Sequence, residues 1–263
     1  VYKRQALIHG LLGAMTVTPG VSDRLDRVPV VTASQMREVD RLMIDEAGIT
    51  LTQMMENAGR ALARVAVQEA GGSARRLRVV VLAGSGGNGG GGLVAARRLA
   101  CWGARVMAVL SRAELHGVPA QQRDAAEASG VHVLAGPPGP ADLDGTDVVL
   151  DAVLGYSLAG APTGAALELV EATSGARRRG IPVVSLDLPS GLDPDTGVPP
   201  GAVVTATHTV TLALPKPGLL TETGRTYVGA LSLADISVPE WVYQRVGVDP
   251  GELFATSDVV RLV

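Results

Sequence analysis

The stretch from residue 77 to residue 99 constrains the fold more than any other part of the chain. Residues 79–83 form a short run rich in valine, and seven of the next nine residues, 84–92, are glycine. A short strand that is apolar on both faces is typical of a buried parallel strand. The residues after the glycines place leucine, valine and alanine on one helical face and Arg97 and Arg98 on the other. The stretch therefore predicts a strand, a tight turn and a helix that packs against a sheet.

The glycine segment itself predicts an anion site. Glycine allows positive φ and a close approach of the backbone to a ligand, and the amides that open the next helix point at an anion. No Lys-Ser/Thr pair follows the last glycine, so this is not the phosphate loop of nucleoside triphosphatases. A flexible linker is the alternative, and the apolar flanks disfavour it. We expect a loop that cradles phosphate.

Composition limits the class of protein. The chain has 263 residues, a formal charge of −3 and only 3% aromatic residues, without a basic run, so no nucleic-acid groove is indicated. No apolar run reaches the roughly 18 residues needed to span a bilayer, so no membrane association is expected.

Cys101 is the single cysteine. We expect its thiol to be buried and the protein to be cytoplasmic, in a reducing compartment.

We predict two regions, a poorly ordered extension over residues 1–30 and a single domain over residues 31–263. Thr32 and Gln35 form a capping-box pattern for a helix that ends near residue 47, and a second helix begins near Thr50 or Thr52 and ends near residue 70. Strands are then expected at residues 79–83, 105–110, 131–134, 147–153, 181–188 and 209–214, with helices between several of them. This order predicts a Rossmann-like three-layer α/β/α sandwich with a mostly parallel sheet and two N-terminal helices.

Four of these strands end in polar loops. Because the carboxyl ends of parallel strands share one edge of a sheet, the loops should meet in one crevice. Two aspartates end apolar strands, where a carboxylate is costly without a nearby cation or donor, although each alone could cap a turn. A lysine between two prolines is either rigidly presented to the site or simply solvated. The residues brought to the crevice are Asn88, Asp151, Asp187, Ser190 and Lys216.

These motifs together resemble the NAD(P)H-hydrate epimerases, the YjeF N-terminal family, over residues 31–240. The resemblance implies a homodimer with a Rossmann-like fold that interconverts the R and S forms of hydrated NADH and NADPH in nucleotide repair, with a bound potassium ion. It also implies a separate NAD(P)HX dehydratase as functional partner, because the sequence shows no kinase-like dehydratase domain. The matching segments are TASQMREVD, MENAG, GSGGNGGGGLVAARRL, DAVLG, LDLPSGLDPDTG and TLALPKPG.

Matched by position, the resemblance implies specific site residues. Asp187 and Lys216 would be catalytic, with Asp187 as the acid/base, since inversion of the hydrated carbon needs proton movement with loss and return of hydroxide. The potassium ligands would be Asn88, Asp151 and Ser190, oxygen donors that suit a hard cation. The substrate would be bound by Gly87, Asn88, Gly89, Gly90, Gly91, Gly155, Tyr156, Ser157, Leu158, Ala159, Gly160, Ala161 and Asp187.

The chain departs from the family pattern in three places. The family loop usually reads GNNGGDG, whereas here Gly87 replaces the first asparagine and Gly91 the aspartate, and His208 stands where an acidic residue is frequent. Loss of a buried charge-assisted contact would cost about 1–3 kcal/mol. A catalytically silent nucleotide-binding or protein-interaction module is therefore the alternative.

An NAD-dependent oxidoreductase is disfavoured, because such an enzyme needs an acidic residue near the end of the second strand to bind the ribose. The nearest acidic residue is Glu114, which lies beyond Arg112.

Overall fold

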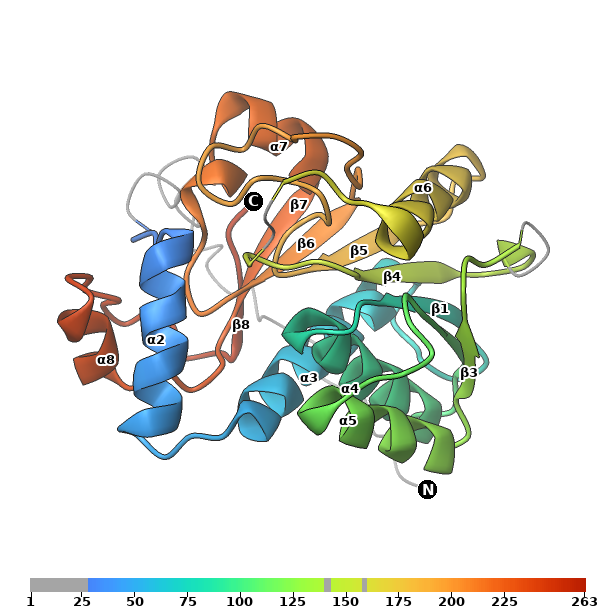
Figure 1. Cartoon of the computed structure of the whole chain (residues 1–263), viewed down its shortest axis with the longest axis horizontal. Coiled ribbons are helices and arrows are strands. Elements are labelled where there is room, and N and C mark those ends of the chain that lie inside the picture. The colour runs from blue at the N-terminus through green and yellow to red at the C-terminus, as the bar shows by residue number, and fades with distance from the viewer. Residues whose placement is uncertain (1–27, 140–142, 158–159) are drawn as a thin grey trace, which may run out of the picture.

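The computed structural model describes residues 28–139, 143–157 and 160–263 (Figure 1). Nearly all of the predicted extension, residues 1–27, lies outside the described residues, and the division at residue 30 stays a prediction. No helix in the described ranges has the length and apolar character needed to cross a membrane.

The described chain forms an eight-stranded sheet in the order β3-β2-β1-β4-β5-β6-β7-β8. All neighbouring strands are parallel except β7 and β8. The predicted α/β fold with a mostly parallel sheet is confirmed. The strands are β1 (Arg78–Ala83), β2 (Arg105–Leu110), β3 (His132–Ala135), β4 (Val148–Ala152), β5 (Val183–Leu186), β6 (His208–Leu212), β7 (Ala230–Ala234) and β8 (Val259–Arg261).

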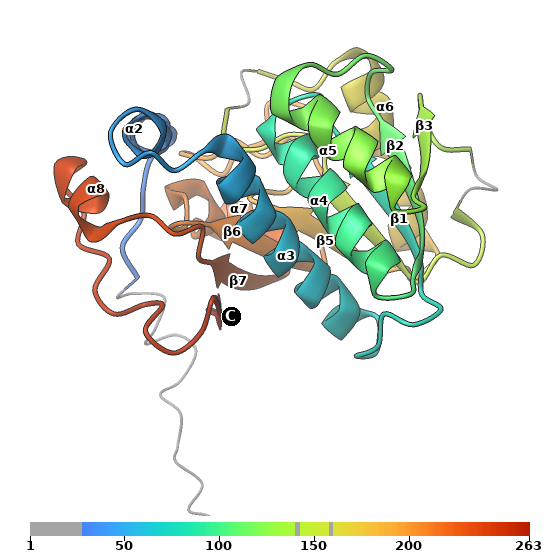
Figure 2. The same cartoon turned by 90° about the horizontal axis from the view of Figure 1, so that it is seen from below.

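Helices cover both faces of the sheet. Alternate residues of β1 divide between two apolar clusters: Val79 and Val81 pack with the face covered by α3 and α4, and Val80 and Leu82 with the face covered by α6. Figure 2 shows α3, α4 and α5 side by side over the first face, with α6 beyond the strands. The helices are α2 (Ala33–Asp45), α3 (Leu51–Glu69), α4 (Gly87–Cys101), α5 (Gly117–Ala128), α6 (Gly164–Arg178), α7 (Glu222–Val228) and α8 (Glu240–Arg245).

Helix α2 begins at the predicted capping box. The Gln35 amide donates to Thr32 Oγ1 at 3.2 Å, and the Thr32 amide donates to Gln35 Oε1 at 2.9 Å. Long-range bonds anchor this helix: the Val31 amide donates to the Pro215 carbonyl at 3.0 Å, and the Ala33 amide to Asp195 Oδ1 at 2.8 Å. The N-terminal end of α2 is therefore fixed beside the loop that follows β6.

The glycine segment differs from the prediction. Helix α4 begins at Gly87, and none of the glycines from residue 84 to residue 92 has a positive φ, so they do not use the left-handed backbone that glycine allows. Close packing is the reason for glycine here: a Cβ on Gly89 would lie 1.8 Å from the Gly84 carbonyl oxygen, and one on Gly84 would lie 1.9 Å from the Val153 oxygen. Glycine thus lets the start of α4 press against the carboxyl ends of β1 and β4.

Two further expectations are corrected. Cys101 is exposed at the last turn of α4, rather than buried. Strand β5 ends at Leu186, two residues before the expected end, because Asp187 takes φ = 67° and turns the chain out of the sheet. Helices α7 and α8 and strand β8 were not predicted, since each is too short for its hydrophobic period to be recognised.

Candidate active site

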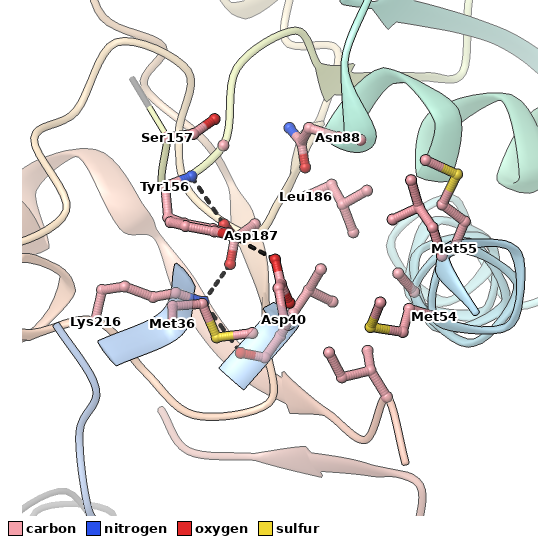
Figure 3. A pocket seen from close by; sticks show the side chains of 16 residues that line it. Met36, Asp40, Met54, Met55, Asn88, Tyr156, Ser157, Leu186, Asp187 and Lys216 are labelled. Carbon is pink, nitrogen blue, oxygen red and sulfur yellow. Dashed lines mark hydrogen bonds and ion pairs between the residues drawn. The ribbon is translucent and has the colours of Figure 1, made fainter. Parts of the chain in front are cut away.

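A cavity of about 280 Å³ lies where the carboxyl ends of β5 and β6 meet α2, α3 and the start of α4. Its walls differ in character (Figure 3). Met54 and Met55 of α3 lie on one side, and polar groups from α2, from the start of α4 and from the segments after the strands lie on the other. The polar side chains that line it are Asp40, Asn88, Tyr156, Ser157, Asp187 and Lys216.

Asp187 is the most constrained of these residues. It is 3% exposed and has a left-handed backbone, which asparagine and aspartate tolerate better than most residues. Lys216 Nζ donates to its Oδ1 at 2.5 Å, and the Tyr156 amide donates to its Oδ2 at 3.0 Å. A strained backbone that fixes a carboxylate at a cavity is a recurring feature of functional sites.

Lys216 is fully buried, so the alternative of a solvated loop lysine is wrong. Besides Asp187, its Nζ donates to the Leu212 carbonyl at 3.0 Å and lies 5.9 Å from the centre of the Tyr156 ring. A buried ammonium group needs such partners, because desolvation of an isolated charge is very costly. The ion pair holds the Asp187 side chain in one orientation, at the wall of the cavity.

Asp151 ends β4, next to β5, and has no exposed surface. Ser190 Oγ donates to its Oδ1 at 2.5 Å, and the Ser190 amide and Ser185 Oγ donate to its Oδ2 at 2.9 and 2.7 Å. Burial raises the pKa of Asp151, and these hydrogen bonds oppose that rise. No ion pair to Asp151 exists among the described residues, so neutral donors alone hold this carboxyl.

Asn88 and Ser190 approach the same region from different elements. Ser190 Oγ also lies 3.1 Å from the Leu154 carbonyl oxygen, directly before Gly155. A Cβ on Gly155 would lie 3.4 Å from Asn88 Oδ1 and 3.2 Å from Asp187 Oδ2, so both side chains crowd this glycine. Asn88 Nδ2 is buried and has no partner among the described residues. Asn88 and Asp187 therefore flank this loop, and Ser190 links the loop to Asp151, but neither Asp151 nor Ser190 lines either of the cavities that contain Asn88.

A second cavity, of about 500 Å³, adjoins the first and shares Asn88 and Gly155 with it. It lies over the carboxyl ends of β1, β2 and β4, where the strand order reverses and open α/β sheets bind ligands. No carboxylate lines it in the described ranges, and Arg112 is the cation that does. We refer to these two adjoining cavities together as the crevice; two carboxyl groups and Lys216 line the first, and Arg112 lines the second.

The remaining predicted residues are divided between this crevice and the core. Gly87, Tyr156, Ser157 and Ala161 line one or both cavities. Gly89, Gly90 and Gly91 lie behind them inside α4, where a Cβ on Gly91 would lie 2.8 Å from Leu186 Cδ2. Gly160 is exposed. Leu158 and Ala159 lie outside the described residues.

Sequence reasoning missed Asp40 and Arg112. Asp40 reaches the first cavity from α2, and its Oδ2 accepts a hydrogen bond from the Tyr156 hydroxyl at 2.5 Å. It stands four residues after the buried Met36, on the same helical face. An acid on an otherwise apolar face was the signal available. Arg112 lies just beyond the end of β2, an edge already expected to bind ligand.

Comparisons with known proteins identify the family of this chain. The family described as YjeF-related protein N-terminus matches residues 51–218. The NAD(P)H-hydrate epimerase of Dehalogenimonas lykanthroporepellens is 44% identical over 219 residues, which cover 83% of this chain and 86% of that protein. The NAD(P)H-hydrate epimerase of Truepera radiovictrix is 37% identical, over 89% of this chain and all of that protein.

Two further relatives extend the comparison. The bifunctional NAD(P)H-hydrate repair enzyme Nnr of Salinibacter ruber is 35% identical over 88% of this chain, which spans only 44% of that protein. The crystal structure of the yeast protein ynu0 superposes with a TM-score of 0.76 at 25% identity, over 89% of this chain and all of that one. By the family match, by identity over most of its length and by its fold, the chain belongs to the YjeF N-terminal family.

Proposed function

We propose that this protein is an NAD(P)H-hydrate epimerase, an isomerase that interconverts the R and S forms of hydrated NADH and NADPH in nucleotide repair. The relatives that share most of its length carry this name. The observation that carries the proposal is the Asp187–Lys216 pair: Asp187 is buried, has a strained backbone, contacts Lys216 and lies at the wall of a cavity.

The reaction requires proton transfer and a cavity that holds the ring of the substrate. Inversion at the hydrated ring carbon breaks one carbon–oxygen bond and forms another on the opposite face. Asp187 exchanges a proton with the departing or entering water, which is general acid–base catalysis. Lys216 orients Asp187, and the methionines of α2 and α3 give the ring an apolar surface that limits access of other water.

The second cavity would hold the rest of the dinucleotide. The N-termini of α4 and α6 border it, and neither has a side-chain cap, so their free amides suit a pyrophosphate. Arg112 adds a positive charge where no carboxylate competes within the described part of the chain. The crevice therefore suits a ligand with a neutral ring at one end and phosphates along the remainder.

We further propose a potassium site formed by Asn88, Asp151 and Ser190. Two observations support it: Asp151 is fully buried without an ion-pair partner among the described residues, and Asn88 Oδ1 lies beside the same loop, 3.4 Å from the Cβ position of Gly155. Carboxylate, amide and hydroxyl oxygens are the donors a hard cation prefers. When bound, the ion would supply positive charge beside the glycine segment and offset the charge of Asp151.

Potassium binding has a readout other than activity. A ligand at 100 times its Kd raises the free energy of unfolding by about 2.7 kcal/mol. We expect potassium chloride to raise the thermal midpoint above that in equal lithium chloride, and Asp151→Asn to abolish the difference. Equal midpoints for the unmodified protein in both salts would remove the potassium proposal.

The decisive experiment for the function supplies one purified epimer of hydrated NADPH and follows the R to S ratio by chromatography. Equilibration faster than in buffer alone is expected. Binding without turnover would instead favour the silent nucleotide-binding module. A homodimer, a cytoplasmic location and a separate dehydratase partner stay predictions from the family resemblance, and light scattering would test the first.

A further inference from the structure

We propose that Asp40 is a second catalytic carboxyl of this site, which protonates the departing hydroxide while Asp187 accepts a proton from the entering water. The inference rests on the proposed epimerase function. It assigns the second proton-transfer group, which Asp187 alone does not provide. Asp40 comes from α2, a helix outside the segment that matches the family description.

The first argument is position. Asp40 and Asp187 line the same cavity, and Tyr156 contacts both (Figure 3). The Tyr156 amide donates to Asp187 Oδ2 at 3.0 Å, and its hydroxyl donates to Asp40 Oδ2 at 2.5 Å. One residue therefore fixes one oxygen of each carboxyl. Asp40 Oδ1 has no hydrogen-bond partner among the described residues, so it is available to a ligand in the cavity.

The second argument is the difference between the two environments. Lys216 pairs with Asp187, whereas no described cation forms an ion pair with Asp40. Burial raises the pKa of Asp40; the Tyr156 hydrogen bond and the charge of Lys216 oppose the rise, and the charge of Asp187 adds to it. Tyr156 stays a donor, because burial and Asp40 raise the pKa of its hydroxyl while Arg37 opposes this. Two acids with divergent environments divide the roles of acid and base.

The proposed step balances. The Asp40 proton moves to the hydroxyl on the hydrated ring carbon, the carbon–oxygen bond breaks, and its electron pair leaves with water. The ring is left as a cation conjugated with its nitrogen. A water molecule adds to the opposite face, a new carbon–oxygen bond forms, and Asp187 takes the proton. In the reverse reaction Asp187 protonates the departing hydroxyl group and Asp40 takes a proton from the entering water, and exchange with solvent resets the pair between turnovers.

Asp40→Asn tests the assignment, because it keeps the shape and the acceptor for Tyr156 but removes the acidic proton. We expect kcat to fall about 10²- to 10⁴-fold, as for loss of a general acid. The alkaline limb of the pH profile of kcat/KM, which reports ionisation of Asp40, should disappear from the residual activity. Asp45→Asn is the matched control: Asp45 is on the same helix, is exposed and lies 3.6 Å from Arg41, so wild-type rates are expected.

Tyr156→Phe tests whether Asp40 has a purely structural role, because such a role would leave the pH profile unchanged. Removal of the hydroxyl takes away a hydrogen bond that lowers the pKa of Asp40, so the alkaline limb should move to higher pH. A wild-type pH profile in both Tyr156→Phe and Asp40→Asn, with kcat within threefold, would overturn the proposal. Thermal melts check that each variant is folded, and Asp40→Glu, which retains an acid, should recover part of the activity lost in Asp40→Asn.

The two proposals fail separately. If the unmodified protein does not interconvert the epimers, the proposed function is wrong, whatever Asp40 does. If it interconverts them and Asp187→Asn is inactive while Asp40→Asn is not, the epimerase stands and the role given to Asp40 is withdrawn.

Discussion

Strand β6 has a buried titratable side chain with hydrogen-bond partners at each of its ends, and the two networks have different roles. At its start, His208 Nδ1 lies 3.0 Å from Glu69 Oε1 and its Nε2 lies 2.8 Å from Ser232 Oγ. Beyond its end, Lys216 pairs with Asp187. His208 has a partner for each ring nitrogen and lines neither cavity of the crevice, whereas Asp187 faces one. A buried titratable side chain alone therefore does not identify a site; an adjoining cavity and a strained backbone do.

The largest effect expected from this contrast is on activity. Asp187→Asn should lower kcat by about 10²- to 10⁴-fold, because the acid/base is lost. Asparagine tolerates the left-handed backbone and keeps an oxygen for Lys216, so circular dichroism should show a folded protein. Wild-type turnover in a folded Asp187→Asn protein would remove Asp187 from the mechanism.

The next largest effect is on stability. Lys216→Met leaves the Asp187 carboxylate buried without its cation, and breaking a buried pair this way costs about 3–5 kcal/mol. Urea denaturation measures the loss. The double variant with Asp187→Asn should cost less than the sum of the two single changes, because it buries no unpaired charge. Additive losses would mean that the two residues do not interact.

A smaller effect is expected at the opposite end of β6. His208→Gln should cost about 1–2 kcal/mol of stability through its hydrogen bonds, with kcat unchanged. If His208→Gln lowers kcat as much as Lys216→Met does, the proposed distinction between the two networks is wrong.

The same histidine gives a pH dependence of known sign. Burial lowers the pKa of His208, and its hydrogen bond to Glu69 opposes this only in part. As the pH falls, the unfolded chain therefore binds this proton before the folded protein does. The contribution of neutral His208 to the free energy of unfolding is complete above about pH 6.5 and is lost as pH falls through the lowered pKa. Unfolding measured from pH 8 to pH 5 should show this loss in the wild type and a flatter curve in His208→Gln.

The smallest effect is expected at the rim of the crevice. Around Gly87 a Cβ would meet only Met55 Cε, at 3.9 Å, so Gly87→Asn, which restores the family residue, should change stability by less than about 0.5 kcal/mol. Gly91→Asp should be more costly, since its Cβ would press on Leu186 Cδ2 at 2.8 Å. Comparison of KM for the two variants shows whether the rim accepts a further polar contact.

Local patterns in the sequence predicted most of the fold. The capping box of Thr32 and the strand over residues 105–110 were confirmed, since each depends on neighbouring residues. The shared edge of the sheet also followed from parallel strand order. By contrast, the helical glycines, the burial of Lys216 and the position of Asp40 depend on contacts between distant parts of the chain. Lys216 meets Asp187 across 29 residues, and Tyr156 meets Asp40 across 116.

Helix α2 has a practical consequence for work on related chains. The family match starts at residue 51, yet the helix before it supplies Met36 and Asp40 to the cavity and is tied to Pro215 and Asp195. A fragment trimmed to the matched segment would keep the central strands and lose the wall of the first cavity that α2 provides. If such a fragment failed to turn over substrate, the cause would be the missing helix α2, and the result would say nothing about the chemistry of the family.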